Sequence, residues 1–381
     1  MTIFILDIWK IIFDLLDFKS KMNLISTCKY LRQRLYITDL YNIDEKYLCK
    51  LTTEILQYSI FDHVLYLDTY NNYNITNVSF MKNLKKLNAG NRSKIDQNGI
   101  KGLDLLELNV TNNNNIFDVS FMKNLKILNA YGCGINQNGI TGLDLIELDI
   151  SYNNNINDIS FMKNLKKLNI CYSCGIDQSS INNLDLIELN ASWNNKINNI
   201  SFMKNLKKLN AGFNCGIDQN SIIGLDLVEL DINDNNNIKD VSFMKNLKIL
   251  NVSGKCGVDQ NGIKGLDLIK LNISGNNKIN NVSFMKSLKI LYANDSNLCQ
   301  KGIEGLNLIE FYVAHNKTIY NVSHMKNLKI LNASSHHCGI DQNGIEGLDL
   351  IKLYIIGNDK INDVSFMKNL IEVDISDNDK N

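Results

Sequence analysis

One nine-residue stretch reads Leu105-Leu106-Glu107-Leu108-Asn109-Val110-Thr111-Asn112-Asn113. In an extended backbone alternate side chains point to opposite faces, which predicts a strand with Leu108 and Val110 inward and Asn109 outward. The pattern returns at intervals of 20 or 21 residues, with one interval of 22, and its sixteen copies start at Val64, Leu84, Leu105, Leu125, Leu145, Leu165, Leu186, Leu206, Leu227, Leu247, Leu268, Leu288, Leu308, Leu328, Leu350 and Leu370. A fixed period of this size predicts stacked supersecondary units that bury their apolar faces against one another.

Two kinds of connecting segment alternate between these strands. One carries Ser79-Phe80-Met81-Lys82-Asn83-Leu84-Lys85, and its apolar spacing predicts short turns packed under the sheet. The other, typified by residues 133–140, predicts a short helical turn punctuated by glycine. The first kind forms an aromatic column, which we expect in the core, of Phe80, Phe121, Phe161, Phe202, Phe243, Phe284 and Phe366. His324 takes the place of phenylalanine in one copy and is expected to be a core histidine with satisfied hydrogen bonds.

Polar columns follow the strands. Asparagine recurs where the chain leaves alternate strands, at Asn113, Asn153, Asn194, Asn235, Asn276, Asn316 and Asn358. A buried amide there can bond free backbone groups of neighbouring turns, because it both donates and accepts. Cysteines take the equivalent place in the other repeats, at Cys133, Cys174, Cys215, Cys256 and Cys338. Because these cysteines lie two strand spacings apart, they stack about 10 Å from one another, too far for a disulfide. We therefore expect them to be small buried hydrophobic residues of a protein in a reducing compartment.

This pattern resembles the leucine-rich-repeat family, whose L-x-x-L-x-L-x-x-N/C core it matches over most of the chain. The resemblance implies an α/β fold, a leucine-rich-repeat solenoid with a curved parallel sheet of about sixteen repeats. We expect this solenoid to occupy residues 64–381. In this family the concave strand face usually binds partners.

Residues before Val64 do not repeat. Their apolar residues follow helical spacing in two stretches: Ile5, Ile8, Ile11, Ile12, Leu15 and Leu16, and then Leu24, Ile25, Cys28 and Leu31. The run 5–16 followed by 24–32 resembles an F-box, although Leu6 stands where that family usually has proline. The resemblance implies that residues 1–40 dock a Skp1-like adaptor of a cullin ubiquitin ligase, with these ten residues as the adaptor-binding set.

The alternative for residues 1–40 is a helical cap that covers the apolar edge of the first strand. A nearer segment offers the same service, because Asp44 to Ser59 carries Tyr47, Leu48, Leu51, Ile55 and Leu56 at helical spacing. We therefore assign residues 41–63 to a connector and helical N-terminal cap. The whole chain resembles the F-box/leucine-rich-repeat proteins of giant amoebal DNA viruses.

The outward positions of the strands should carry partner specificity. Lysine and glutamate alternate on neighbouring strands, which favours mutual neutralisation over a binding role. Aromatic residues are better candidates, because they dominate the hot spots of protein interfaces. The predicted target-binding residues are Tyr131, Tyr152, Tyr172, Trp193 and Phe213 just past the strands, and Tyr292, Tyr312 and Tyr354 at the fifth strand position.

Composition excludes several other functions. Forty basic residues balance forty acidic ones, so no global field attracts nucleic acid or an anionic membrane, and no stretch reaches the length of a membrane span. Asp7 interrupts the first apolar run, so we expect no signal peptide and a cytoplasmic location, in the host cell if the source is viral. No catalytic or metal-binding motif is present, and we expect no enzyme activity, no metal and no cofactor.

We therefore predict a substrate-recognition subunit of an SCF-type ubiquitin ligase, monomeric apart from its partners. Its F-box would bind the adaptor and its repeats would bind an unknown target protein. The alternative is a leucine-rich interaction scaffold with a helical cap and no link to ubiquitin.

Overall fold

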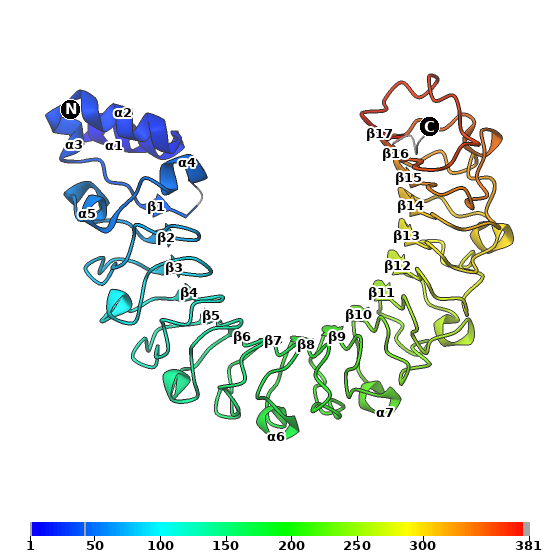
Figure 1. The fold of residues 1–381 in the computed structure, drawn as a ribbon, viewed down its shortest axis with the longest axis horizontal. Coiled ribbons are helices and arrows are strands. Elements are labelled where there is room, and N and C mark those ends of the chain that lie inside the picture. The colour runs from blue at the N-terminus through cyan, green and yellow to red at the C-terminus, as the bar shows by residue number, and fades with distance from the viewer. Residues whose placement is uncertain (1, 42, 376–381) are drawn as a thin grey trace, which may run out of the picture. The chain divides into compact units, whose positions relative to one another are not determined.

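The computed structural model describes residues 2–41 and 43–375, and the side chains of residues 2–5, 7 and 8 lie outside that description. It divides into two compact units, Met1–Leu184 and Asp185–Asn381. Both units are stacks of coils in which each coil contributes one short strand (Figure 1).

The first unit has seven strands, and each pairs in parallel with the next one along the chain. They are β1 (Asp39–Leu40), β2 (Tyr66–Asp68), β3 (Lys86–Asn88), β4 (Glu107–Asn109), β5 (Ile127–Asn129), β6 (Glu147–Asp149) and β7 (Lys167–Asn169). Ten strands follow the same rule in the second unit. They are β8 (Glu188–Asn190), β9 (Lys208–Asn210), β10 (Glu229–Asp231), β11 (Ile249–Asn251), β12 (Lys270–Asn272), β13 (Ile290–Tyr292), β14 (Glu310–Tyr312), β15 (Ile330–Asn332), β16 (Lys352–Tyr354) and β17 (Glu372–Asp374).

The sixteen predicted strands are confirmed. Strands β2 to β17 each begin two residues after one of the predicted starts. Leu108 and Val110 are fully buried while Asn109 is only partly covered, as the alternation requires. Only β1 was not predicted, because its two residues carry no repeat pattern.

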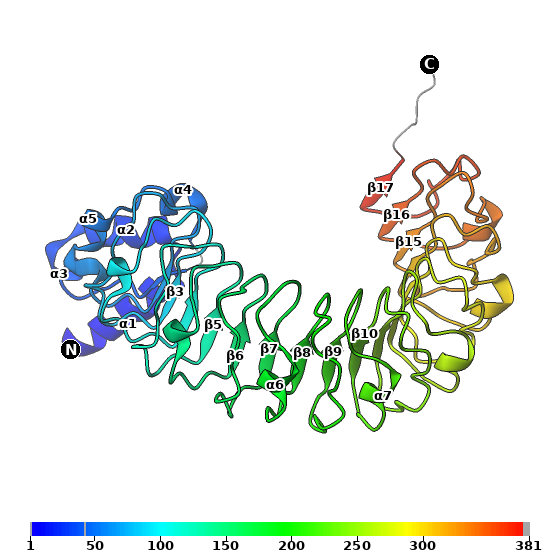
Figure 2. The same ribbon diagram turned by 60° about the horizontal axis from the view of Figure 1, so that its bottom comes forward.

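The connecting segments lie on the side of each coil opposite the strands (Figure 2). In alternate coils they form one short helical turn each: η2 (Asn98–Ile100), η3 (Asn138–Ile140), α6 (Gln178–Ile181), α7 (Gln219–Ile222), η4 (Asn261–Ile263), η5 (Gln300–Ile303) and η6 (Asn343–Ile345). In five of the seven turns a glycine precedes the final isoleucine, and close packing requires it there, since a Cβ on Gly139 would collide with the carbonyl oxygen of Phe117. In α6 and α7 a serine takes this place, and the hydroxyls of Ser180 and Ser221 donate to the carbonyls of Asn157 and Asn198. The prediction of short helical turns is confirmed, and glycine punctuates five of them.

The aromatic column does not belong to the core, and that prediction was wrong. Phe161 is 38% exposed, whereas the neighbouring Met162 is completely buried. The backbone forms single turns here, with Met162 N–H donating to the carbonyl of Ile159, so residues three apart point inward together. This three-residue spacing turns Met162 inward and leaves Phe161 at the surface. His324 is exposed for the same reason.

The asparagine column is confirmed as a structural ladder. Asn113 is buried, its Nδ2 donates to the carbonyls of Ala89 (2.8 Å) and Ile95 (3.0 Å), and its Oδ1 accepts from Asn115 N–H (2.9 Å). The ladder begins one repeat earlier than predicted, because Asn72 bonds the carbonyls of the preceding coil in the same way. The five repeat cysteines are buried free thiols, as expected.

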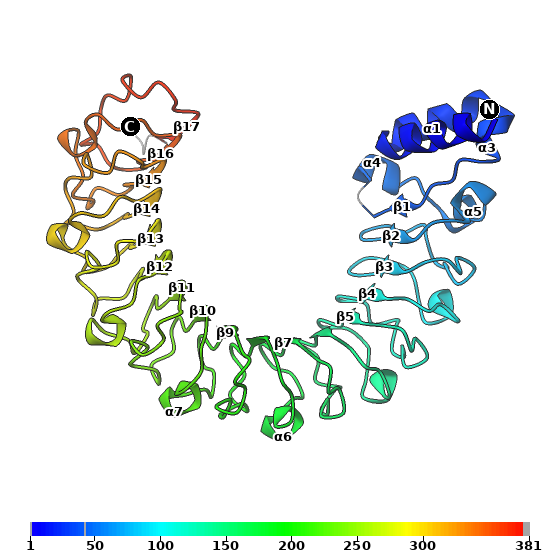
Figure 3. The ribbon, with the colours of Figure 1, turned by 180° about the vertical axis from the view of Figure 1, so that it is seen from behind.

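The N-terminal segment contains α1 (Thr2–Leu15), α2 (Phe18–Thr27) and α3 (Lys29–Arg32), which lie together ahead of β1 (Figures 1 and 3). After β1 come α4 (Glu45–Leu48), α5 (Thr53–Leu56) and η1 (Ser59–Phe61). The single helix expected from Asp44 to Ser59 is therefore broken. Thr52 adopts an extended conformation and caps α5 by accepting from Ile55 N–H, which ends helical continuity there.

Candidate binding surfaces

Helix α1 has apolar residues on two sides. Phe13 is buried, and Leu6, Trp9 and Leu16 are partly covered; these residues recur every three or four positions and form the packed side. On another side Ile11 is 62% exposed and Leu15 is 83% exposed, with Ile12 next to them at 39%. An apolar helix surface that is left in water marks an interaction site more often than chance.

The remaining predicted adaptor residues are distributed between surface and core. Cys28 is exposed, and Leu16 and Leu24 are partly covered. Ile25 and Leu31 are buried, so they hold the three helices together and cannot contact a partner. The side chains of Ile5 and Ile8 lie outside the described residues.

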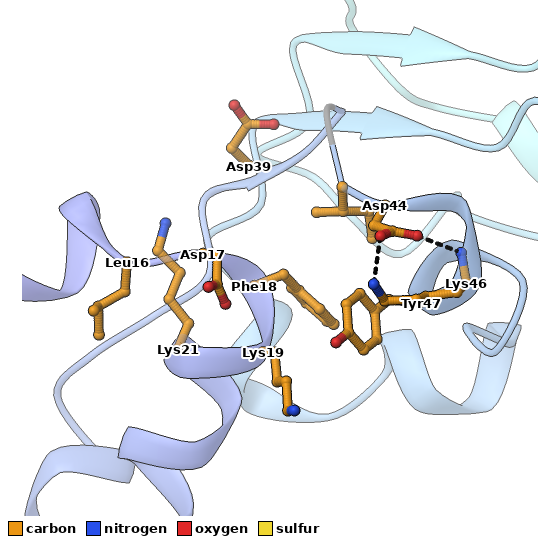
Figure 4. Close-up of a pocket in the computed structure, with 10 residues that line it drawn as sticks. Leu16, Asp17, Phe18, Lys19, Lys21, Asp39, Asp44, Lys46 and Tyr47 are labelled. Carbon is orange, nitrogen blue, oxygen red and sulfur yellow. Dashed lines mark hydrogen bonds and ion pairs between the residues drawn. The ribbon is translucent and has the colours of Figure 1, made fainter.

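A pocket lies where α2 faces α4 (Figure 4). The rings of Phe18 and Tyr47 form its apolar wall, with their centroids 5.6 Å apart. Its charged lining comprises Asp17, Lys19, Lys21, Asp39, Asp44 and Lys46. Three carboxylates balance three ammonium groups, and Asp44 already pairs with Lys46 at 2.6 Å. The charges that line the pocket therefore cancel, and they favour neither an anionic nor a cationic ligand. The pocket lies at the contact between α2 and α4.

The alternating charges of the strand face neutralise one another, as expected. Lys86 pairs with Glu107 at 2.8 Å, and Lys167 pairs with Glu147 at 2.7 Å. The second unit repeats the arrangement, with Lys352 and Glu372 2.6 Å apart. Exposed pairs of this kind contribute little stability, about 0.2–1 kcal/mol each. They leave those strands without a charge to offer a partner.

The aromatic residues past the strands form two clusters. In the first unit Tyr131, Tyr152 and Tyr172 make a tyrosine row, with centroid separations of 5.2 Å and 4.4 Å. In the second unit the rings of Trp193 and Phe213 stack at 4.6 Å.

Four of these aromatic residues have a left-handed backbone. The φ angles are 56° at Tyr152, 61° at Tyr172, 61° at Trp193 and 56° at Phe213. In other coils the equivalent position carries residues that adopt positive φ more easily, such as Asn112, Asp234 and Gly275. A left-handed conformation costs most side chains about 1–2 kcal/mol. Strain of this kind is typical of functional positions, which supports the choice of these aromatics as binding residues.

The strand tyrosines replace a structural residue. At the same place in other strands an asparagine or aspartate accepts a hydrogen bond from the backbone two residues later, as Asn251 does from Ser253 N–H (3.2 Å). A phenol cannot reach back to make this bond. Instead Tyr292 and Tyr312 stack at 4.4 Å, and the Tyr354 hydroxyl donates to Glu372 at 3.0 Å. Burial and the nearby Glu310 carboxylate raise the pKa of Tyr312, so its phenol stays protonated and remains a donor.

A hollow of 240 Å³ opens beside Tyr292 on the face of β10 to β13. Glu229, Asp231, Ile249 and Lys270 also line it. Burial raises the pKa of the Asp231 carboxyl, which Asn251 holds at 3.0 Å. The hollow is large enough for one side chain of a partner.

One exposed residue escaped the sequence reasoning. Arg92, just past β3, is the only arginine after Arg34, and that rarity was the one signal that could have singled it out.

Among the described residues no helix combines the length and apolarity needed to cross a bilayer.

No family model matches the chain, and no curated protein matches it. Among solved structures it resembles the TLR13–ssRNA13 complex, with 19% identity, a TM-score of 0.49 and coverage of 90% of this chain and 57% of that one. It resembles the mouse RP105/MD-1 complex with 15% identity, a TM-score of 0.48 and coverage of 90% of this chain and 67% of that one. It resembles the yeast Rad7–Elc1 complex with 16% identity, a TM-score of 0.44 and coverage of 76% of this chain and 80% of that one. This chain thus spans little more than half of the TLR13 chain, and the likenesses concern the fold alone.

The repeating strands, the asparagine ladder and the leucine core define a leucine-rich-repeat solenoid. A small helical segment precedes it. Stacked repeats of this kind present an extended surface formed by equivalent positions of successive coils.

Proposed function

We propose that this chain is the substrate-recognition subunit of an SCF-type ubiquitin ligase. Its helical segment binds a Skp1-like adaptor, and its repeat surface binds a target protein. The receptor does no covalent chemistry itself; it brings the target close to a ligase bound elsewhere. It works in the cytoplasm, in that of the host cell if the source is viral.

The observation that carries this proposal is the two-sided apolar character of α1. One side already packs through Phe13, so the exposed Ile11, Ile12 and Leu15 are not needed to hold the helix in place. These three large aliphatic side chains lie on adjacent turns, and burial of each against a partner would contribute roughly 1.5–3 kcal/mol. Side chains of this kind anchor a helix in the groove of its partner. The resemblance to an F-box in this same segment suggests the adaptor as the partner.

The target side of the proposal rests on the aromatic residues. The tyrosine row, the stacked pair of Trp193 and Phe213, and the strand tyrosines are large rings, and residues of this kind contribute most of the binding energy of protein interfaces. Each group departs from the residue that local structure favours, either by positive φ or by loss of the asparagine turn.

A second candidate function is a scaffold whose helical segment serves as a cap. The observation that favours it is the packing of this segment on the first coil. Leu35 and Ile37 are buried, Ile37 N–H donates to the carbonyl of Ile60 at 3.0 Å, and the rings of Tyr36 and His63 lie 4.0 Å apart.

Point substitutions distinguish the two functions better than a truncation, because removal of residues 1–40 would also delete β1 and expose β2. We expect the full chain to co-elute with a purified Skp1-like adaptor, and the double variant Ile11→Glu/Leu15→Glu to elute alone. The variant Asp14→Lys, on the same helix and also exposed, should bind normally. If the segment is only a cap, no adaptor will bind to any of the three proteins.

A further inference from the structure

The edge where the chain leaves the strands of the first unit continues beyond the tyrosine row. Residues with positive φ follow one another along it, coil by coil: Asn71, Asn91, Asn112, Gly132, Tyr152 and Tyr172. The part near β2 to β4 is therefore lined by amides, and the part near β5 to β7 by aromatic rings. The two parts differ in chemistry but share one edge of one compact unit.

The amide part contains a hollow of 490 Å³ lined by Tyr70, Asn71, Asn91, Arg92 and Asn112. Arg92 is exposed, and its Nη1 donates to the hydroxyl of Tyr73 at 3.2 Å. In the described part of the chain no carboxylate forms an ion pair with its guanidinium. Lys94, two residues on, is exposed as well.

The chemistry of this hollow suits a carboxylate. A guanidinium presents two parallel N–H groups that match the two oxygens of a carboxylate, and its planar fork makes this geometry specific. The tyrosine hydroxyl at 3.2 Å holds the guanidinium in place, and the Asn112 amide donates to Asn91 Oδ1 at 3.0 Å, which orders the amides beside it. A phosphate group is usually bound by a cluster of arginines, whereas this edge carries a single arginine. A single carboxylate therefore fits better.

We infer that this edge binds an extended segment of the target that carries an Asp or Glu side chain at Arg92 and a large apolar side chain at the tyrosine row. Two to four strand steps separate the coil of Arg92 from those of Tyr131 and Tyr172. At about 4.8 Å a step this is roughly 10–19 Å, or about three to six residues of extended chain. The inference rests on the proposed function and specifies which targets the receptor selects.

The test is selection from a random peptide library displayed on phage, with the full chain immobilised. We expect enriched peptides to carry an acidic residue and an aromatic or large aliphatic residue about three to six positions apart. For the tightest of them, Arg92→Gln should weaken binding at least about tenfold and abolish the preference for the acidic residue. The matched control is Lys255→Gln, which removes an exposed positive charge at the equivalent place in the second unit and should have no effect.

A second variant separates the two parts of the edge. Tyr152→Asn should remove the preference for the apolar residue while the preference for the acidic residue persists. The inference is overturned if no peptides are enriched, if enriched peptides lack an acidic residue, or if they bind Arg92→Gln as tightly as the parent.

These outcomes are independent of the adaptor. Arg92→Gln should co-elute with the Skp1-like adaptor like the parent chain. Selection of acidic peptides by a chain that binds no adaptor would refute the ligase receptor and leave the peptide site standing.

Discussion

At the scale of single residues, the position just past each strand shows where function departs from stability. Its backbone is left-handed, which suits asparagine, aspartate and glycine, yet Tyr152 and Trp193 occupy it in the middle of the chain. The sequence showed the aromatic residues but not their backbone; the signal for positive φ was the asparagine, aspartate or glycine that recurs at this position in other coils. It is the combination of ring and strain that makes them candidates.

Replacing Tyr152 with asparagine should change the free energy of unfolding by less than about 1 kcal/mol in either direction. Relief of about 1–2 kcal/mol of left-handed strain offsets the loss of two ring contacts, which are worth about 0.5–1.5 kcal/mol each. Urea denaturation measures the change, and a destabilisation of more than about 1 kcal/mol would mean that the ring is structural.

A substitution in the asparagine ladder, in contrast to one at Tyr152, should lower the free energy of unfolding. Asn235→Ala should lower the free energy of unfolding by about 2 kcal/mol or more, because the carbonyls of Ala211 and Ile217 lose their donor in the interior. The neighbouring Asn236→Ala removes an exposed amide and should change it by less than about 0.5 kcal/mol. Equal effects of the two substitutions in urea denaturation would contradict the ladder.

At the scale of elements, the strands were predictable and the helical parts less so. Leu105, Leu108 and Val110 repeat with a period that admits one interpretation. Phe161 and Met162 are adjacent and both apolar, so hydrophobicity alone could not decide which one faces inward. The break at Thr52 and the pairing of β1 with β2 depend on tertiary contacts that local sequence does not contain.

The corrected position of the phenylalanine column has a measurable consequence. Met162→Ala should destabilise the chain by about 2–5 kcal/mol, since it opens a cavity in the core. Phe161→Ala removes a ring that is partly in water and should cost less than about 1.5 kcal/mol. If the phenylalanine variant proves the less stable of the two in urea denaturation, the column is part of the core after all.

At the scale of the whole molecule, buried thiols recur through both units. Burial raises the pKa of Cys133, Cys215 and Cys256 to about 11. The thiols of the unfolded chain ionise near pH 8.5, so the unfolded state loses protons that the folded state keeps. Their contribution to stability is complete below about pH 8.5 and disappears as the pH rises to about 11.

We therefore expect the urea midpoint to fall between about pH 8.5 and 11, and to fall less in a variant with Cys133→Ala, Cys215→Ala and Cys256→Ala. Thiol reagents at pH 8 should modify the exposed Cys28 and Cys49 well before the buried cysteines, as mass spectrometry would show. An identical pH dependence in the parent and the variant would remove the thiols from this account.

The repeats extend through both units, whereas α1 lies outside them and carries three exposed aliphatic side chains, Ile11, Ile12 and Leu15. Its role decides whether this protein is a ligase receptor. The most direct measurement is calorimetric titration of a purified Skp1-like adaptor into the full chain and into Ile11→Glu/Leu15→Glu. The account predicts saturable binding by the full chain and none by the variant, with equal thermal stability of the two proteins. No binding by the full chain, or equal binding by both proteins, would contradict it.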